Sequence, residues 1–362
     1  MKDFFHSPKT TLVIRKHQSF DLNQNVLFFL GTLIFKEASF FQNKEQLISF
    51  VEQERITTIL FFSPYANVMN KRVYDWIRES RCSSYVVCEK GALPDSIYLD
   101  DTGFLNDSDY YRPEYWNRPL TKEQREQIIT YTNELLKSGV TREANPARTS
   151  LSQVKKELGV VANRRVLFVP FQRQKDAVIR HFCGAIKSYD CFYNAIQSFA
   201  KARSDWQVIY KNHPNEKEFL HIENGICADN YNAYDLIELC DAVALINSGL
   251  GIFSLLLGKP TYVFGDAWYA HNALTVSVNQ RKTLDECLIE PFVPEREMVL
   301  RFLYYLRFSF YSFVEVNESS LSDGSSTFSV SIRELGHVPM IKPNFLGNYQ
   351  KNRSVEGTIN AD

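Results

Sequence analysis

The stretch that decides the fold is residues 241–275, DAVALINSGLGIFSLLLGKPTYVFGDAWYAHNALT. Residues 242–246 form a short apolar run with the length of a buried strand, and residues 252–257 are apolar enough to form a buried helix. Gly258 fits the left-handed position that follows a helix end. Residues 261–264 supply a second strand. The pattern therefore predicts a strand–loop–helix–strand unit of an α/β protein.

The first loop of this unit carries its chemistry. Asn247, Ser248, Gly249 and Gly251 stand where the strand turns into the helix. The two glycines let the backbone approach a ligand closely, and the serine adds a hydroxyl donor. The helix start would present free N–H groups and a positive dipole end, which suits a phosphate or a carboxylate. The alternative is a glycine turn that only packs the helix against the sheet.

Length and composition limit the class of protein. The chain has 362 residues, of which 44% are hydrophobic, so it is long enough for two domains with substantial cores and is not disordered. Lys and Arg number 41 against 42 Asp and Glu, and this balance gives no general preference for nucleic acid. We therefore expect no nucleic-acid partner.

Cysteine spacing and apolar runs predict the compartment. The seven cysteines include no C-x-x-C pair, so they carry no zinc signature and indicate a reducing compartment. Residues 1–10, MKDFFHSPKT, lack the apolar run of a signal peptide. The apolar run at 26–35 is too short to span a bilayer, which takes about 20 residues. We expect a soluble, cytoplasmic protein without a metal site.

Strands and helices alternate in two series along the chain. Strands are expected at 26–31, 57–62 and 85–88, and then at 166–169, 206–210, 242–246 and 261–264. Such alternation predicts parallel sheets covered on both faces. We predict an α/β protein with two Rossmann-like domains facing a cleft. The N-terminal domain would span 1–150, the C-terminal domain 151–313, and a polar tail 314–362.

A long helix is expected at 295–313, at the end of the second domain. It is apolar and aromatic, with Arg296, Arg301 and Arg307 interspersed. A buried helix that crosses back to the first domain is the favoured interpretation, and peripheral contact with a membrane surface is the alternative.

Three polar residues follow expected strands of the second domain: Asp176, His213 and Ser248. Because the carboxyl ends of parallel strands meet at one edge of a sheet, we expect these side chains to converge there. His213, with Lys211 before it and Pro214 after it, suits phosphate binding, and a structural His-Pro turn is the alternative. Asp176 suits a general base or a nucleophile, and the cap of the following helix is the alternative.

Glu89 occupies a comparable place in the first domain, directly after the strand expected at 85–88. Open α/β sheets bind ligands at such strand ends, so Glu89 is a candidate for the site. A surface carboxylate in a turn is the alternative. In the second domain, Gln172 lies four residues before Asp176 and is an amide neighbour that could orient this carboxylate.

Seven short motifs follow one another along the chain. They are Glu89-x-Gly91 with Pro94, Asp95, Ser96, Leu99, Asp100 and Gly103; Gln172-x-x-x-Asp176; Lys211-x-His213-Pro214; Ser248-Gly249-x-Gly251; Gly258-Lys259-Pro260; Trp268-Tyr269; and Ala273-Leu274-Thr275. In this order they resemble the capsule polysaccharide synthesis family, whose characterised members are Kdo transferases that use CMP-Kdo. The His-Pro and Ser motifs are shared with bacterial sialyltransferases, which also use a CMP-sugar. The chain departs from the family at residues 252–254, where Glu-Ala-Leu is usual, and at Ala273, where glycine is usual.

The resemblance implies a two-domain glycosyltransferase of the GT-B type without a separate cofactor. It implies that His213 and Ser248 bind the phosphate of a CMP-sugar donor. The residues grouped with them are Lys211, Pro214, Asn247, Gly249, Gly251 and Gln172. By analogy, Asp176 is the nucleophile that takes the sugar, with net retention of configuration, and Glu89 assists proton transfer at the acceptor. If Asp176 is instead a base for direct displacement, the configuration inverts.

The function that this resemblance implies is transfer of Kdo, or a related sugar, to a glycan or lipid-linked acceptor in capsule or surface polysaccharide assembly. The place would be the cytoplasm, or the inner face of the bacterial inner membrane. Two alternatives stay open. The same fold could use CMP-sialic acid or a UDP-sugar, or the protein could be a noncatalytic polysaccharide-binding or assembly subunit.

Overall fold

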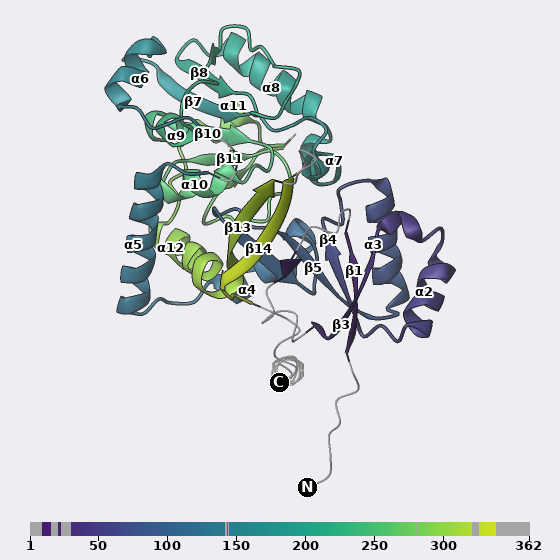
Figure 1. Ribbon diagram of the computed structural model, residues 1–362. Coiled ribbons are helices and arrows are strands. Elements are labelled where there is room, and N and C mark those ends of the chain that lie inside the picture. The colour runs from purple at the N-terminus through teal and green to yellow at the C-terminus, as the bar shows by residue number, and fades with distance from the viewer. Residues whose placement is uncertain are drawn as a thin grey trace, which may run out of the picture. The chain divides into compact units, whose positions relative to one another are not determined.

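The structure is a computed structural model that describes residues 9–15, 21–22, 30–141, 143, 145–279, 281–320 and 326–337. It divides into two compact units, each built on its own sheet (Figure 1). The first unit combines Met1–Gly91, Asp95–Phe104 and Ser309–Asp362, and the second combines Ala92–Pro94 and Leu105–Phe308. The strand expected at 26–31 lies outside the described residues, except for its last two positions.

The first unit contains a mixed sheet. Its described strands are β1 (Thr10–Ile14), β2 (Asp21–Leu22), β3 (Thr32–Lys36), β4 (Thr58–Phe62), β5 (Ser84–Lys90), β6 (Ser96–Asp100), β13 (Ser312–Ser320) and β14 (Ser326–Glu334). They lie in the order β2-β14-β13-β6-β5-β4-β1-β3. The strands from β5 to β3 pair in parallel, whereas β5, β6, β13 and β14 pair antiparallel in turn. Helices α2 (Lys44–Gln53) and α3 (Val68–Ser80) connect the parallel strands.

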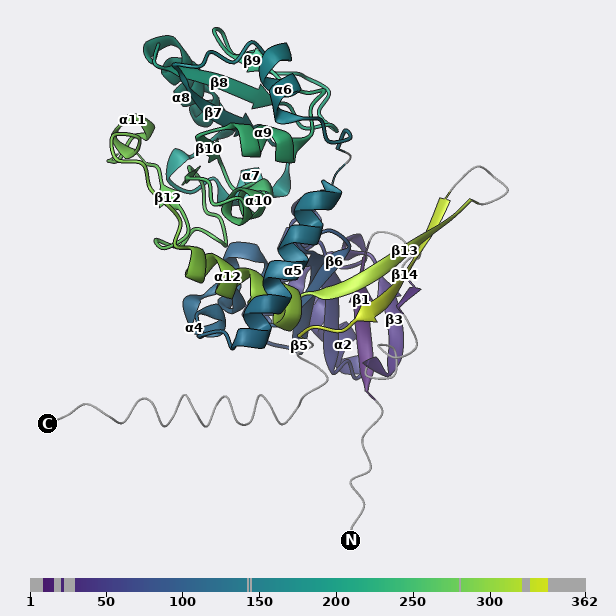
Figure 2. The ribbon, with the colours of Figure 1, turned by 90° about the vertical axis from the view of Figure 1, so that its left-hand side faces the viewer.

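The expected polar tail is wrong where it covers β13 and β14. β13 pairs with β6, and β14 returns antiparallel to β13, so that Figure 2 shows them as two long neighbouring arrows. Val314 is 3% exposed and belongs to a core cluster with Val86 and Cys88 of β5. Apolar residues alternate with polar ones in β13, which is the pattern of a strand with one buried face. Residues 321–325 and 338–362 lie outside the described part of the chain.

The second unit contains a sheet whose described strands all pair in parallel. The strands are β7 (Arg165–Pro170), β8 (Trp206–Lys211), β9 (Ile226–Cys227), β10 (Ala242–Leu245), β11 (Thr261–Val263) and β12 (Val276–Ser277). The described helices are α4 (Pro113–Trp116), α5 (Lys122–Ser138), α6 (Leu151–Glu157), α7 (Ala177–Phe182), α8 (Tyr189–Ala202), α9 (Ala233–Leu239), α10 (Leu250–Leu256), α11 (Leu284–Cys287) and α12 (Arg296–Tyr305).

Helices cover both faces of this sheet (Figure 1). On one face, alternate residues of the strands, such as Leu167 and Val169, share a core cluster with Phe192 and Ile196 of α8. On the other face, α9 packs on β7, and α10 packs on β10 and β11. Two buried faces explain why these strands are short continuous apolar runs.

The strand order of the second sheet is β12-β11-β10-β7-β8-β9. The chain therefore moves outward in one direction from β7 to β9, returns to the middle, and moves outward in the other direction from β10 to β12. This is a doubly wound sheet, and its order reverses between β7 and β10. At such a reversal the two loops that leave the strands diverge, and ligands bind in the crevice beyond the carboxyl ends.

The segment near residue 150, where the domain boundary was expected, lies inside the second unit. The Arg148 Nε atom lies 2.7 Å from Oδ1 of Asp235, a fully buried carboxylate of α9, and the Thr149 amide donates to the same carboxylate at 2.8 Å. The Tyr234 hydroxyl donates to the Val140 carbonyl at 3.0 Å. The polar composition of this segment thus serves specific bonds to α9 rather than a mobile linker.

The helix expected at 295–313 is shorter than predicted. α12 ends at Tyr305, a π-helical turn follows at Leu306–Phe310, and the chain then enters the sheet of the first unit as β13. Glu297 pairs with Arg125 of α5 at 2.6 Å and with Arg301 at 3.1 Å, while the Arg307 guanidinium lies 5.0 Å from the centre of the Tyr131 ring. These contacts hold α12 and the turn after it against α5, which belongs to the same unit. Among the described residues, no helix is both long and apolar enough to cross a membrane.

Candidate functional site

The candidate site is the carboxyl edge of the second sheet, around the reversal between β7 and β10. The segment 171–176 leaves β7, the segment 246–249 leaves β10, and His213 follows β8, which is the other neighbour of β7. The structure therefore brings Asp176, His213 and Ser248 to one edge of one sheet, as the sequence predicted. Glu89 belongs to the first unit.

The two loops at the reversal are joined by side chains. Gln172 Nε2 donates to Asn247 Oδ1 at 2.9 Å, and the Asn247 backbone amide donates to Gln172 Oε1 at 3.1 Å. Asn247 Nδ2 also donates to the carbonyls of Val178 and Phe182 in α7, at 3.2 and 2.8 Å. Asn247 is 8% exposed. These two residues were expected to bind the donor, and in the structure their polar groups are bonded to each other and to α7.

Asp176 lies at the start of α7 and is partly exposed. Its side chain accepts a hydrogen bond from the Val178 amide at 3.4 Å, so it is the cap of this helix. The Arg180 guanidinium, one turn further on, donates to the Lys175 carbonyl at 2.7 Å. Capping occupies one carboxylate oxygen and fixes its direction, which leaves the partly exposed carboxylate able to meet a ligand at the sheet edge.

The loop after β10 differs from the expectation in one respect. The amides of Leu250 and Gly251 are bonded to Oγ and the carbonyl oxygen of Ser248 at 3.3 and 3.0 Å, and the Ile252 amide is bonded to the Gly249 carbonyl at 3.1 Å. These first N–H groups of α10 are therefore not free for an anion. Ser248 Oγ acts here as an acceptor, and its own hydroxyl hydrogen can still be donated to a ligand.

Gly251 has a packing role that its sequence motif did not reveal. A Cβ atom on Gly251 would lie 2.4 Å from the hydroxyl oxygen of Tyr269, so only glycine leaves room for this ring. Tyr269 is fully buried, and its hydroxyl donates to the Ser248 carbonyl at 2.5 Å. A Cβ atom on Gly249 would meet only the Cβ of Ala92, at 3.8 Å. Gly249, which is exposed, is thus the glycine that permits close approach.

His213 lies in a turn directly after β8. Its Nδ1 atom accepts a hydrogen bond from the Asn215 amide at 3.1 Å, and its carbonyl accepts one from Glu216 at 2.9 Å. The structural His-Pro turn, with Pro214 exposed, is therefore present. Because Nδ1 is an acceptor, a neutral imidazole carries its hydrogen on Nε2, which can donate to an anion.

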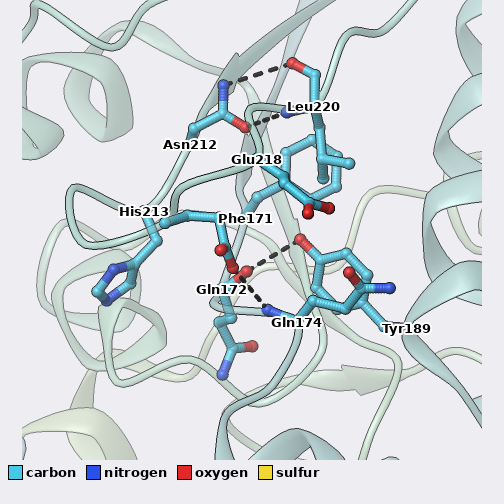
Figure 3. Close-up of a pocket in the computed structure, with 9 residues that line it drawn as sticks. Phe171, Gln172, Gln174, Tyr189, Asn212, His213, Glu218 and Leu220 are labelled. Atoms are coloured by element: carbon cyan, nitrogen blue, oxygen red, sulfur yellow. Dashed lines mark hydrogen bonds between the residues drawn. The ribbon is translucent and has the colours of Figure 1, made fainter.

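A small pocket lies beside His213 between the ends of β7 and β8 (Figure 3). It is lined by Phe171, Gln172, Gln174, Tyr189, Asn212, His213, Glu216, Glu218 and Leu220. In Figure 3 the imidazole of His213 points away from Tyr189 and Leu220. Backbone amides, that of Lys217 first, lower the pKa of Glu216, so this pocket carries a negative charge at neutral pH. A phosphate bound by His213 would therefore lie outside this pocket.

Lys211 is buried and does not present its ammonium group at the surface. It is 9% exposed, and its Nζ atom donates to the carbonyl of Asp229. Burial lowers the pKa of its ammonium group. The Asp229 carboxylate in turn accepts from the amide and side chain of Asn212, at 2.7 and 3.1 Å. The hydrogen bond of the Lys211 ammonium group thus ties β8 to residue 229 and does not join it to His213 or Ser248.

Glu89 lies within strand β5 rather than after it, because β5 extends to Lys90 and pairs Glu89 with Tyr98 of β6. It is partly exposed, and its Oε1 atom accepts from the Lys90 amide at 2.8 Å. The motif that follows is a tight connection between β5 and β6, since a Cβ atom on Gly91 would lie 2.2 Å from Ser96 Oγ.

Asp100 is a motif residue whose structural role the sequence did not reveal. It is fully buried in the first unit. Its Oδ1 atom accepts hydrogen bonds from the amide and hydroxyl of Thr102, both at 2.7 Å, and from the Gly103 amide at 2.9 Å. Asp100 and Gly103 therefore form a side-chain-capped turn at the end of β6, and this motif is structural rather than part of the second-unit site.

Comparisons with known proteins agree with this architecture. The chain shows similarity to two β-Kdo transferase structures of KpsC from Thermosulfurimonas dismutans. The 2,4 transferase has a TM-score of 0.59 at 16% identity, over 85% of this chain and 93% of that one. The 2,7 transferase has a TM-score of 0.54 at 17% identity, over 88% and 96%. The fold is accordingly the GT-B fold of glycosyltransferases, as predicted.

The family follows from a match in sequence. The model of the family described as capsule polysaccharide biosynthesis protein matches residues 106–307, which is more than half of the chain. The chain belongs to this family, as its motifs predicted. It is also 28% identical over 147 residues to Protein FixF of Sinorhizobium fredii, covering 39% of this chain and 36% of that protein. The chain thus spans about a third of the length of this curated relative.

Proposed function

We propose that the protein is a glycosyltransferase that moves Kdo from CMP-Kdo to a glycan or lipid-linked acceptor during capsule polysaccharide assembly. The observation that carries the proposal is that the segments bearing Asp176, His213 and Ser248 leave the same edge of a doubly wound sheet, in a chain of this family. The two similar structures are named as β-Kdo transferases and support the choice of sugar. CMP-Kdo as the donor follows from the family resemblance of the motifs.

The donor phosphate would be bound at the second sheet. The imidazole Nε2–H of His213 and the hydroxyl of Ser248 would donate hydrogen bonds to its oxygens, and exposed Gly249 would let the backbone come close. These donors stabilise the negative charge that develops on CMP as the sugar leaves. His213 serves this role as a neutral donor and more strongly when protonated.

Asp176 would act as the nucleophile in a two-step reaction. Its carboxylate forms a bond to the anomeric carbon while the bond from that carbon to the phosphate oxygen breaks, and CMP leaves with the electron pair. In the second step, the acceptor hydroxyl attacks the same carbon, the bond to Asp176 breaks, and a base takes the hydroxyl proton, a role that the family resemblance assigns to Glu89. Two inversions give net retention. If Asp176 were only a base, a single displacement would give inversion.

The test is donor turnover and product stereochemistry. The purified protein is incubated with a synthetic acceptor and, in separate reactions, with CMP-Kdo, CMP-sialic acid or a UDP-sugar, and nucleotide release and product mass are followed. The proposal expects CMP release and a product one Kdo heavier only with CMP-Kdo, with β-linked Kdo by NMR. Turnover of another donor would change the substrate. Binding of glycan without turnover of any donor would support a noncatalytic subunit instead.

The place of the protein at the membrane is part of the same proposal. A lipid-linked acceptor would bring the protein to the inner face of the bacterial inner membrane. Direct contact through α12 is not supported by its described contacts, because Glu297 and Arg301 of that helix pair with each other and with α5 or residue 117. We therefore attribute any membrane association to the acceptor rather than to this helix.

A further inference from the structure

The pair Gln172–Asn247 joins two loops that lie 75 residues apart in the sequence. Each residue both donates to and accepts from the other, at 2.9 and 3.1 Å, so the two bonds fix the orientation of the Gln172 side-chain amide. The side-chain amide nitrogen of Asn247 donates to the carbonyls of Val178 and Phe182 in α7, at 3.2 and 2.8 Å. Since Asn247 is 8% exposed and both of its side-chain donors are engaged, this side chain has little capacity to bind a donor substrate.

The same network reaches both groups that the proposed reaction uses. On one side, Asn247 is the residue directly before Ser248. On the other side, the Val178 carbonyl accepts from Asn247, while the Val178 amide donates to the Asp176 carboxylate at 3.4 Å. A continuous path of hydrogen bonds and peptide groups therefore links the carboxylate on the β7 side to the hydroxyl on the β10 side.

We propose that Gln172 and Asn247 are positioning residues, which hold the Ser248 loop and the Asp176 cap in a fixed relation without touching the donor. This inference rests on the proposed function, because it concerns the same site. Small displacements of binding groups cost much of their effect, since hydrogen bonds weaken steeply with distance and angle. The pair would thus make Ser248 effective rather than add a contact of its own.

The experiment is a double-mutant cycle on the affinity for CMP, measured by calorimetry with the full chain. Gln172→Met keeps the length of the side chain and removes both hydrogen bonds, and Ser248→Ala removes the hydroxyl. We expect Ser248→Ala to weaken CMP binding about 10-fold in the natural protein and less than about 3-fold in the Gln172→Met protein, because coupled residues are not additive. Gln172→Met alone should weaken binding about 5-fold or more.

Gln207→Met is the matched control. Gln207 is 7% exposed, lies near the opposite end of the sheet in β8, and also makes one bond as donor and one as acceptor, to the Gly159 carbonyl and from the Val161 amide, both at 3.1 Å. It should lower the melting temperature about as much as Gln172→Met and leave CMP affinity unchanged.

Four outcomes separate the possibilities. Equal effects of Ser248→Ala in both backgrounds, or an unchanged affinity in Gln172→Met, would overturn the positioning role while the donor site stands. An equal loss of affinity in Gln207→Met would show that general stability is responsible and would also overturn it. An unchanged affinity in Ser248→Ala alone would instead remove Ser248 from the proposed donor site, and the positioning role with it.

Discussion

The Tyr269 hydroxyl donates a 2.5 Å hydrogen bond to the Ser248 carbonyl, and its ring fills the space above Gly251. The second half of the predicted loop motif is therefore explained by packing, because Gly251 admits a buried tyrosine that holds the loop in place. The first half, Ser248 and Gly249, is partly or fully exposed and faces outward from the end of β10.

Gly251→Ala should disturb this contact. The new methyl carbon would lie 2.4 Å from the Tyr269 oxygen and 2.5 Å from Cζ, so the ring must move. We expect a loss of about 1–3 kcal/mol in the free energy of unfolding, as for other overpacked sites, and weaker CMP binding. Tyr269→Phe removes only the hydrogen bond and should cost about 1 kcal/mol.

Gly258→Ala is the control for that prediction. Gly258 follows α10 with φ of +67°, and a Cβ atom there would meet nothing within 4 Å. We expect a cost of about 1 kcal/mol from backbone strain and unchanged CMP binding. Calorimetry and chemical denaturation measure both quantities. Equal CMP affinity in Gly251→Ala and the natural protein would contradict the role given to Tyr269.

Substitution can separate the cap role of Asp176 from its proposed role in catalysis. Asn is as good a helix cap as Asp, so Asp176→Asn should leave the melting temperature nearly unchanged and abolish turnover. Asp176→Ala removes the cap as well and should cost a further ~1 kcal/mol of stability. Turnover and thermal unfolding are measured on the same samples. An active Asp176→Asn protein would exclude the carboxylate as nucleophile or base.

Arg148 should contribute strongly to stability because it pairs with Asp235, a carboxylate of α9 whose side chain is 0% exposed. Arg148→Met would remove the guanidinium partner of that buried carboxylate and leave the hydrogen bond from the Thr149 amide. Since Arg148 is 30% exposed, we expect about 2–3 kcal/mol, near the low end for a broken buried pair. Lys201→Met breaks an exposed pair with Glu223, which is screened by solvent, and should leave the free energy of unfolding nearly unchanged. Equal costs in urea denaturation would contradict this account.

Val314 tests whether β13 belongs to the sheet of the first unit. It is 3% exposed and packs with Val86 and Cys88, so Val314→Ala should cost about 2 kcal/mol of unfolding free energy. Glu315, its exposed neighbour, should tolerate Ala with little change. A mobile tail at this position would make both substitutions neutral in thermal denaturation.

His271 should make stability depend on pH. Burial lowers its pKa from the ordinary value of 6.5, and its Nε2 atom is buried without a hydrogen-bond partner among the described residues. The unfolded chain therefore binds this proton more readily than the folded one. Its contribution to stability is complete above pH 6.5 and is lost as the pH falls from there towards the lower folded-state pKa.

His271→Gln is the variant that measures this effect. It removes the titrating group, so the fall in melting temperature between pH 7.5 and about 5.5 should be smaller than in the natural protein. An identical pH profile for both proteins would show that other groups account for acid destabilisation.

The sequence was informative where local pattern decides the structure. Apolar runs of strand length located β7, β8, β10 and β11, and their polar ends located Asp176, His213 and Ser248, because parallel strands bring their carboxyl ends together. The helix cap at Asp176 and the His-Pro turn were both open alternatives, and both are present alongside the positions expected for a site.

The sequence was less informative where distant residues decide the structure. The Gln172–Asn247 pair spans 75 residues and the Arg148–Asp235 pair 87, so no local pattern indicates either partner. The polar segment near residue 150 therefore resembled a linker. β13 resembled a tail because Ser and Glu alternate with its few apolar residues, and its pairing with β6 and β14 is visible only in the structure. Lys211 has the composition of a phosphate ligand, and its burial against Asp229 is visible only in the structure.

The most direct test of the central claim is mass spectrometry of the protein after incubation with CMP-Kdo in the absence of acceptor. The account predicts release of CMP and a protein one Kdo heavier, with the added mass on the peptide that contains Asp176 and none in Asp176→Asn. Release of CMP by Asp176→Asn at the natural rate, with no Kdo on either protein, would contradict it.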